Sequence, residues 1–407
     1  MSGHTLVLVE SNTSGSGRVF PVAARALGLR PVMLAADARR YPFVGELEVV
    51  EVDTGSVPAV VAACRRLAPV AGVVSSSEYF IRTAALAAAA LHLPGPDPEA
   101  VGSARDKGEQ RRVLAAGGVR QPEFAVATTV EQALAAAEAI GCPVVVKPVA
   151  GSGSVGVRLS RDLEGVAAHA GKLLAAGLDE RGRGVPHRIL VEAFADGPEY
   201  SVEVFGGLAL GVTGKHLGPL PCFVEVGHDF PAQVEDLVRT SVTEAAETAV
   251  RLLGLTFGPA HVELRVTAEG PTLIEVNPRL AGGWIPRLVE TATGIDLICE
   301  TIRVFTGRRV CLAPTRSRAA ALRFVLAPGS GTLDGLPGLE EARRAEGIVE
   351  AIAYRDLGAE VAVHGDFRDR IGHVLAAAPT VAAAAATADH LVQAVHPVLY
   401  ATQEVSL

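Results

Sequence analysis

Aromatic residues are scarce in this chain of 407 residues, since Phe, Trp and Tyr together make up 4% of it and there is a single Trp. The five cysteines contain no CxxC pair, so the sequence carries no signature of a structural zinc site or a redox dithiol. Their number is odd, which does not suit a disulfide framework. We therefore expect reduced thiols and a cytoplasmic protein.

Long apolar runs and long basic runs are both missing. The alanine-rich stretches at Ala84–Ala90 and Ala382–Ala386 are far shorter than the roughly 20 apolar residues of a membrane span. No basic run is longer than a pair, and the net charge is −8. The first ten residues lack the basic start of a signal peptide. These absences argue against a membrane protein, a secreted protein and a nucleic-acid-binding protein.

Short apolar runs alternate with helical patterns over the first hundred residues, before a Pro-rich break at Leu93–Pro98. Alternation of this kind predicts an open parallel α/β domain, which we place at 1–110. The predicted strands and helices lie, in chain order, at Thr5–Glu10, Val19–Leu27, Arg30–Ala35, Leu47–Val52, Val57–Leu67 and Val70–Ser75.

The rest of the chain mixes helices and strands without regular alternation. Helices are predicted at Glu109–Ala116 and Glu131–Ile140, and a strand at Val144–Lys147. We place a second domain at 111–306, with a smaller subdomain at about 111–195, and an α+β unit at 307–407. That last unit ends in an alanine-rich helix near Thr380–Val395. The fold class is thus α/β and α+β.

A Gly-rich segment follows the strand at Val144–Lys147 and contains a GxGxxG pattern at Gly151–Gly156. The dinucleotide-binding form of this pattern must lie between a strand and a helix, whereas strands are predicted here on both sides. The segment is then a hairpin flap, whose backbone N–H groups could approach phosphate oxygens with Lys147 nearby. An ordinary hairpin loop is the alternative. No Walker A sequence is present.

Hard oxygen donors gather in the segments Gly258–Arg265 and Leu273–Gly283. Glu275 and Asn277 are two residues apart, so on a strand they point to the same face. A hairpin between the two segments would bring Glu263 beside Glu275. Two carboxylates and one amide oxygen predict a Mg²⁺ site, with Arg279 close to an anion. Solvent-facing acids on a strand are the weaker interpretation.

Two further stretches are less specific. Glu192, Ala193 and Phe194 end an apolar strand, where the backbone could pair with an adenine edge, and Glu199 could accept ribose hydroxyls. The loop from Lys215 to Ala232 contains Glu225 and His228, an acid and an imidazole. For this loop, a structural and a functional role are about equally favoured.

In their order along the chain, these residues resemble the ATP-grasp superfamily of carboxylate–amine ligases. The order comprises Lys107, Lys147 before the flap, the Glu192 hinge, Glu263 and then Glu275-x-Asn277-x-Arg279. The resemblance implies an ATP-grasp fold with an N-terminal parallel α/β domain, a central flap subdomain and a C-terminal α+β domain. It covers about 100–300 by motif, and the flanking segments extend it over most of the chain.

Within this superfamily, the loop Phe223–Ala232 is most similar to the L-amino acid ligases that make dipeptides, the bacilysin-type alanine–anticapsin ligases among them. The resemblance implies ATP-binding residues at Lys107, Lys147, Gly153, Ser154, Glu192, Ala193, Phe194, Ala195 and Glu199. It implies metal ligands at Glu263, Glu275 and Asn277. The implied substrate-binding residues are Glu78, Glu225, His228, Arg279 and Gly282, with Arg279 and His228 as catalytic residues.

The activity that the resemblance implies is ATP-dependent joining of an amino-acid carboxylate to an amine, through an acyl phosphate. ATP and two Mg²⁺ ions, with Mn²⁺ as an alternative ion, are the implied cofactors. Amino acids are the implied small-molecule substrates, nucleic acid and membrane are not expected as partners, and a homodimer is left open. Two alternatives remain: a purine-biosynthesis type of enzyme acting on a ribotide bound at the Thr13–Arg18 turn, and a nucleotide-binding regulator without turnover.

Overall fold

The computed structural model describes residues 4–12, 15–41, 45 and 47–400. Its first domain is a four-stranded parallel sheet in the order β3-β2-β1-β4, which confirms the predicted parallel α/β domain. The strands are β1 (Thr5–Val9), β2 (Arg30–Ala35), β3 (Glu48–Glu51) and β4 (Val70–Val74). The helices of this part are α1 (Phe20–Ala26), α2 (Val57–Arg66), α3 (Ile81–Ala90) and α4 (Pro98–Arg105), with short 3₁₀ turns η1 (Gly15–Val19) and η2 (Ala38–Arg40).

The flap subdomain is an antiparallel four-stranded sheet in the order β5-β8-β6-β7. The pairing of β6 with β7 confirms that the Gly-rich segment joins two antiparallel strands and is not part of a βαβ unit. The elements are α5 (Lys107–Ala116), β5 (Phe124–Ala127), α6 (Val130–Ile140), β6 (Val144–Pro148), β7 (Arg158–Ser160), α7 (Leu163–Ala175) and β8 (Ile189–Ala193).

An eight-stranded sheet forms the centre of the molecule, in the order β13-β12-β9-β10-β11-β14-β18-β16. Its last three strands come from beyond residue 306, so hydrogen bonds between β11 and β14 join the second and third predicted domains into one sheet. The strands are β9 (Glu199–Phe205), β10 (Leu208–Leu217), β11 (Glu225–Phe230), β12 (Pro259–Thr267), β13 (Gly270–Asn277), β14 (Ala319–Leu326), β16 (Ile348–Ala353) and β18 (Arg370–Ala378).

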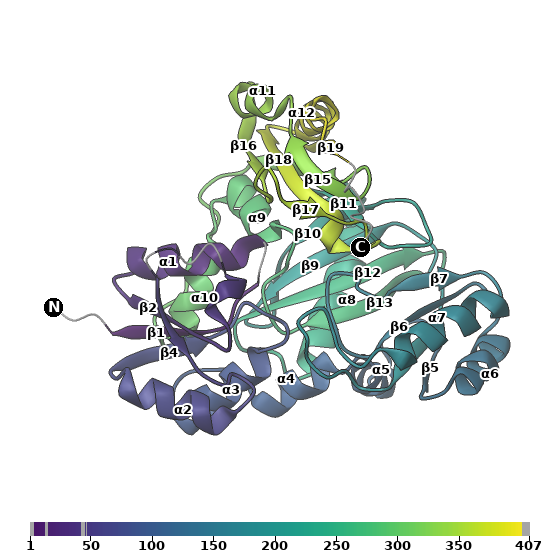
Figure 1. Cartoon of the computed structure of the whole chain (residues 1–407), viewed down its shortest axis with the longest axis horizontal. Helices are drawn as coiled ribbons and strands as arrows, with labels where there is room; N and C mark the ends of the chain where they lie inside the picture. Colours follow the sequence, from purple (N-terminus) through teal and green to yellow (C-terminus); the bar gives the residue numbers. More distant parts are fainter. Residues whose placement is uncertain (1–3, 13–14, 42–44, 46, 401–407) are drawn as a thin grey trace, which may run out of the picture.

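Helices and a small sheet complete the fold. Figure 1 shows the parallel domain in purple to blue, the flap subdomain in teal and the C-terminal unit in green to yellow around the central sheet. The remaining helices are α8 (Asp236–Leu252), α9 (Ile285–Thr293), α10 (Leu297–Phe305), α11 (Leu339–Arg344), α12 (Val381–Ala394) and the turn η4 (Phe367–Asp369). The small sheet, in the order β17-β15-β19, contains β15 (Gly331–Gly335), β17 (Glu360–Val361) and β19 (Val398–Tyr400). Among the helices so described, none has the length and apolar character that a membrane crossing requires.

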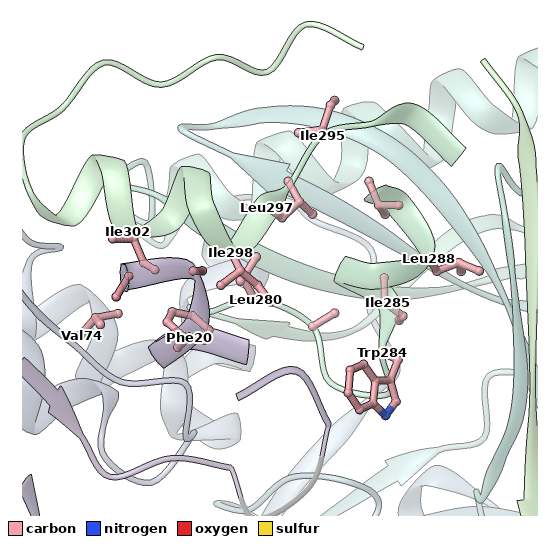
Figure 2. Packing of buried hydrophobic residues seen from close by; sticks show 14 of the residues in the cluster. Phe20, Val74, Leu280, Trp284, Ile285, Leu288, Ile295, Leu297, Ile298 and Ile302 are labelled. Carbon is pink, nitrogen blue, oxygen red and sulfur yellow. The ribbon is translucent and has the colours of Figure 1, made fainter. Parts of the chain in front are cut away.

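The segment after β13 connects the central sheet to the parallel domain. Ile298 and Ile302 of α10 belong to one buried cluster with Phe20 and Val74 of the first domain (Figure 2). These apolar side chains are removed from water together, which stabilises the contact between α10 and the parallel sheet. The packing brings Glu78, which follows β4, to the end of β13.

Candidate active site

One face of the central sheet carries a row of charged side chains. On β12 the residues His261, Glu263 and Arg265 alternate with apolar Val262 and Leu264, so the polar side chains share one face. Register brings polar residues of the neighbouring strands beside them. His261 lies opposite Glu203, and Arg265 lies opposite Glu199, both on β9. Period-two alternation thus builds a polar surface on a sheet whose other face is apolar.

The predicted metal ligands lie together on this face. Glu263 and Glu275 are direct partners in the β12–β13 hairpin, and Asn277 lies opposite His261 on the same two strands. This register confirms the hairpin predicted from the sequence. Each acid is ion-paired: Glu263 Oε1 lies 2.9 Å from Lys215 Nζ, and Glu275 Oε1 lies 3.0 Å from Lys107 Nζ.

Lys215, at the end of β10, gathers three carboxylates. Its Nζ lies 2.8 Å from Glu199 and 2.9 Å from both Glu225 and Glu263. Burial alone would lower the pKa of Lys215, but the three carboxylates outweigh burial and raise it well above its usual value. The lysine is therefore a fixed positive charge at the centre of the site.

His261 lies between two acids and is held as a cation. Its Nδ1 is 2.9 Å from Glu203 Oε1, and its Nε2 is 3.1 Å from Glu263 Oε1. Burial disfavours the charged ring, but these two carboxylates outweigh it and raise the pKa of His261 to about 9. Since both neighbours are acceptors, both ring nitrogens donate.

A second buried ion-pair network underlies the flap. Glu192 accepts from Arg111 Nε at 2.6 Å and pairs with Lys147 Nζ at 2.6 Å. Burial would raise the pKa of Glu192, but the two cations hold it below its usual range. Burial also lowers the pKa of Lys147, which Glu192 opposes. The network fixes the ammonium of Lys147 at the base of the flap.

The first half of the Gly-rich segment is anchored at two points. Lys107 Nζ donates to the carbonyl oxygen of Gly151 at 3.0 Å, and the Phe367 N–H donates to the carbonyl oxygen of Gly153 at 3.1 Å. Lys107 is the first residue of α5, whose N-cap Asp106 accepts two backbone N–H groups. Gly153 has φ +66°, and a Cβ there would lie 2.5 Å from Phe367 Cδ1. Only glycine satisfies both the backbone angle and the close approach.

Some backbone groups of the predicted hinge are already hydrogen-bonded within the protein. The N–H groups of Ala193 and Phe194 donate to Glu123 and Pro143, which leaves them unavailable to a ligand. Beside the hinge, the Arg265 guanidinium lies over the rings of Phe194 and Phe223, 5.3 and 5.4 Å from their centroids. Arg265 also donates to the carbonyl oxygen of Ala195 at 3.1 Å.

These groups line one cavity of about 120 Å³ between the flap and the central sheet. All the predicted ATP-binding and metal-binding residues contribute to its wall, which contains Lys107, Lys147, Gly153, Ser154, Glu192, Ala193, Phe194, Ala195, Glu199, Glu263, Glu275 and Asn277. A second cavity of about 520 Å³ adjoins it. Glu225, Glu263 and Arg279 line both cavities, so the two meet at these side chains.

Arg279 links the sheet to the parallel domain. Its Nε donates to Glu78 Oε2 at 2.6 Å, and its second N–H donates to the carbonyl oxygen of Leu280 at 2.9 Å. Glu78 does not line either cavity, and contacts the site through Arg279. Gly282 lines the second cavity, and a Cβ at this position would meet no atom within 4 Å.

His228 is placed behind Glu225. Its Nε2 lies 3.1 Å from Glu225 Oε2, while its Nδ1 is buried without a hydrogen-bond partner in the described part of the chain. Burial lowers the pKa of His228, which favours the neutral ring. Arg370 donates to the same Glu225 oxygen at 2.9 Å. His228 lines neither cavity, so the structure places it in contact with a site residue, and its catalytic role stays a prediction.

The sequence analysis did not identify several residues of the site, namely Arg111, Lys215, His261, Arg265 and Arg370. The alternation of polar residues along β12 is a signal that could have found His261 and Arg265. The other three depend on pairings between distant segments. Thr13 and Ser14 of the predicted ribotide-binding turn lie outside the described residues, and Gly15–Val19 forms η1.

The donor set fits Mg²⁺. Glu263, Glu275 and Asn277 supply oxygen only, and Mg²⁺ commonly uses one or two carboxylates together with water and substrate phosphates. Within the described ranges, no group of three or more His, Cys, Asp and Glu side chains is arranged to hold a metal ion by itself. A closed cage of His and Cys ligands, such as a structural Zn²⁺ site has, is thus not found among these residues.

Comparison with known proteins identifies the family. Residues 140–287 match the family described as the ATP-grasp domain, and residues 323–400 match the L-amino acid ligase C-terminal domain 2. The chain belongs to the ATP-grasp ligases and carries the C-terminal domain of the L-amino acid ligases. It is an enzyme of that ligase family.

Individual relatives agree with this placement. A Sinorhizobium fredii protein described as uncharacterized protein y4rH is 40% identical over 380 residues, which cover 92% of this chain and 79% of the relative. Human carnosine synthase 1 is 33% identical over 195 residues, which cover 44% of this chain, and the match spans only 22% of that much longer protein. The crystal structure of L-amino acid ligase from Bacillus licheniformis superposes with a TM-score of 0.83 at 24% identity, over 98% of this chain and 100% of that one. The fold is thus that of an L-amino acid ligase.

Proposed function

We propose that the protein joins an amino-acid carboxylate to the amine of a second amino acid, with ATP converted to ADP and phosphate. The observation that carries the proposal is the meeting of the two cavities at Glu225, Glu263 and Arg279. The first cavity has the lysines and the flap that phosphates require, and the second has room for small substrates. A carboxylate at their junction would lie beside both.

The proposed chemistry has two steps. A carboxylate oxygen attacks the γ-phosphorus of ATP and ADP leaves, giving an acyl phosphate. The amine then attacks the acyl carbon, and inorganic phosphate leaves with the oxygen that came from the carboxylate. Charge neutralisation and positioning supply most of the catalysis in such transfers.

Each named residue has a proposed task. Lys107, Lys147 and the flap N–H groups bind phosphate oxygens, and Lys215 adds a third ammonium near them. The carbonyl of Ala193 and the N–H of Ala195 pair with adenine, and Glu199 accepts the ribose hydroxyls. Arg279 stabilises the oxyanion that develops at the acyl carbon, an interaction typically worth about 3–4 kcal/mol. Glu225 binds the ammonium of an amino acid, and His228 positions Glu225.

Glu263, Glu275 and Asn277 would hold two Mg²⁺ ions, for which Mn²⁺ is an alternative. The ions supply charge neutralisation at the phosphates. Lys107 and Lys215, which pair with these acids, limit the repulsion between neighbouring carboxylates.

The ribotide alternative is less well supported. Residues 323–400 match an L-amino acid ligase C-terminal domain, which supports an amino-acid substrate over a ribotide. A regulator without turnover would not require Glu263, Glu275, Asn277 and Arg279 to converge at one junction.

Steady-state kinetics test the proposal. ADP and phosphate release would be measured with Mg-ATP and a panel of amino acids, against ribotides as the competing substrates. Glu225→Ala should raise the KM for the amino acid far more than that for ATP. Glu346→Ala, an exposed acid away from the site, is the matched control. Release with ribotides alone, or an unchanged KM in the Glu225 variant, would contradict the proposal.

A further inference from the structure

The second cavity is strongly cationic away from its junction with the first. Five arginines line it and do not line the first cavity, and one of them, Arg370, pairs with Glu225 at the junction. The other four are Arg40, Arg181, Arg355 and Arg368. They come from η2, the segment between α7 and β8, the segment after β16, and η4. The chain therefore brings guanidinium groups from three of its parts to one wall.

Three of these charges have no carboxylate partner. Arg368 is neutralised by Asp366, whose two oxygens lie 2.9 and 2.5 Å from its nitrogens. For Arg40, Arg181 and Arg355, no carboxylate lies within ion-pair distance in the part of the chain that the structure describes. The inner arginines differ, since Arg279 pairs with Glu78 and Arg370 pairs with Glu225.

Arg181 is held in position by neutral groups that leave its charge intact. Its two terminal nitrogens donate to the hydroxyl oxygen of Tyr41 at 3.1 Å and to the carbonyl oxygen of Ser11 at 2.9 Å. Arg40 donates in turn to the carbonyl oxygen of Arg181 at 2.6 Å. Among the described residues, Glu180 is the one carboxylate that lines this wall away from the junction, and it accepts a hydrogen bond from Tyr79.

Binding of the ATP phosphates does not account for this charge. The lysines proposed to bind ATP line the first cavity, on the other side of the junction. Trp284 and Tyr354 line the same cavity as the three arginines and are stacked, with ring centroids 6.4 Å apart. An apolar stem could lie along these rings with an anionic group at its far end.

We infer that one substrate of this enzyme is an amino acid with a carboxylate side chain, and that Arg355, with Arg181 and Arg40, binds that second carboxylate. This inference rests on the proposed function and specifies one of its substrates. Half-buried Arg355 is the specificity-determining residue, since it has neither an ion pair nor a neutral hydrogen-bond partner among the described residues. Guanidinium and carboxylate form charge-assisted, often bidentate, pairs.

The test compares substrates that differ only in side-chain charge. ADP release would be measured with glutamate against glutamine and with aspartate against asparagine, each with alanine as second amino acid. The acid should exceed its amide in kcat/KM by roughly tenfold or more, and the ratio should fall as ionic strength rises. Equal or inverted ratios in both pairs would overturn the inference while leaving the proposed function standing.

Variants identify the arginine responsible. Arg355→Gln should remove the preference by raising the KM for the acid roughly tenfold while leaving the KM for the amide unchanged, and Arg355→Lys should retain part of it. Arg344→Gln removes an exposed charge on α11 and is the matched control. A loss in the control equal to that in Arg355→Gln would overturn the assignment of Arg355.

Calorimetric binding separates the two claims. Glutamate should bind the enzyme with Mg-ADP present, glutamine more weakly, and Arg355→Gln should abolish the difference. No ADP release with any amino acid would contradict the proposed function, whereas selective binding of glutamate would still support a pocket that binds a side-chain carboxylate. If neither ADP release nor binding favours glutamate over glutamine, the proposal that this cavity binds a side-chain carboxylate is wrong.

Discussion

The ammonium of Lys215 lies 2.9 Å from Oε1 of Glu263, on strands that are separated by β9 in the central sheet. The same ammonium holds Glu199 and Glu225, so one lysine joins the proposed ribose, metal and substrate positions. Its removal leaves buried carboxylates without their counter-charge.

Lys215→Met should therefore lower the free energy of unfolding by about 3–5 kcal/mol, the usual cost of breaking a buried ion pair by removing one partner. Denaturant unfolding measures this loss. Lys172→Met on α7 removes an exposed lysine and should change little. Equal stabilities of the two variants would show that the three acids do not depend on Lys215.

Glu275→Gln should abolish ADP formation while leaving the fold intact. The amide keeps the size of the side chain but removes the charge that a divalent cation requires. Turnover and the thermal unfolding midpoint would be measured together. The exposed Glu269, at the turn of the same hairpin, provides the control variant Glu269→Gln. Undiminished turnover in Glu275→Gln would contradict the metal assignment.

Gly153→Ala tests the flap. A Cβ would clash with Phe367 at a backbone angle that alanine disfavours, so the flap should no longer close on η4. The kcat/KM for ATP should fall by tenfold or more, with little change in the unfolding midpoint. Gly177→Ala, at an open position with no atom near the added Cβ, is the control.

Hydrogen exchange tests the same segment without a mutation. We expect the amides of Gly151–Gly156 to exchange more slowly when nucleotide binds, because phosphate contacts offset the entropy lost by three glycines. Exchange that does not change with ATP would exclude a flap that orders on the nucleotide.

Asp229 gives a pH-dependent prediction away from the proposed metal ligands. Burial would raise its pKa, but His216 and Arg323, each 2.7 Å away, hold it below the usual value. Because the pKa of Asp229 is lower in the folded than in the unfolded protein, its charge stabilises the fold at pH values above the unfolded pKa, near 3.8. This stabilisation is lost as the pH falls through the pKa of the folded protein. Asp229→Asn should cost roughly 1–3 kcal/mol at pH 7.

The cost should shrink progressively below about pH 4, where the wild-type carboxylate also becomes protonated. Unfolding curves at pH 7, 5 and 3.5 measure the trend. A difference between wild type and Asp229→Asn that stays constant over this range would mean that the charge of Asp229 does not stabilise β11 against β14.

Local patterns were enough to predict β2 to the residue, because Arg30–Ala35 is an apolar run bounded by turn residues. The hairpin that pairs Glu263 with Glu275 was also predictable, since the two strands are close in sequence. The continuation of the central sheet beyond residue 306 could not be predicted from the sequence. It depends on β11 pairing with β14 almost a hundred positions later, and no local period encodes such a partner.

The same reason explains which site residues were missed. Lys215 has ordinary neighbours in sequence, and only the order of the strands brings three acids to it. Arg355 follows β16 without any motif, and its place on the wall of the second cavity depends on the packing of the C-terminal unit. Chemistry that arises from convergence of distant segments is visible only in the folded chain.

Isotope transfer tests the central claim most directly. An amino acid labelled with ¹⁸O in its carboxylate would be incubated with the enzyme, Mg-ATP and a second amino acid, and the released phosphate analysed by mass spectrometry. If an acyl phosphate forms, each phosphate carries one ¹⁸O, and ADP, phosphate and dipeptide appear in equal amounts. Phosphate without label, or ADP release without a peptide product, would contradict the account.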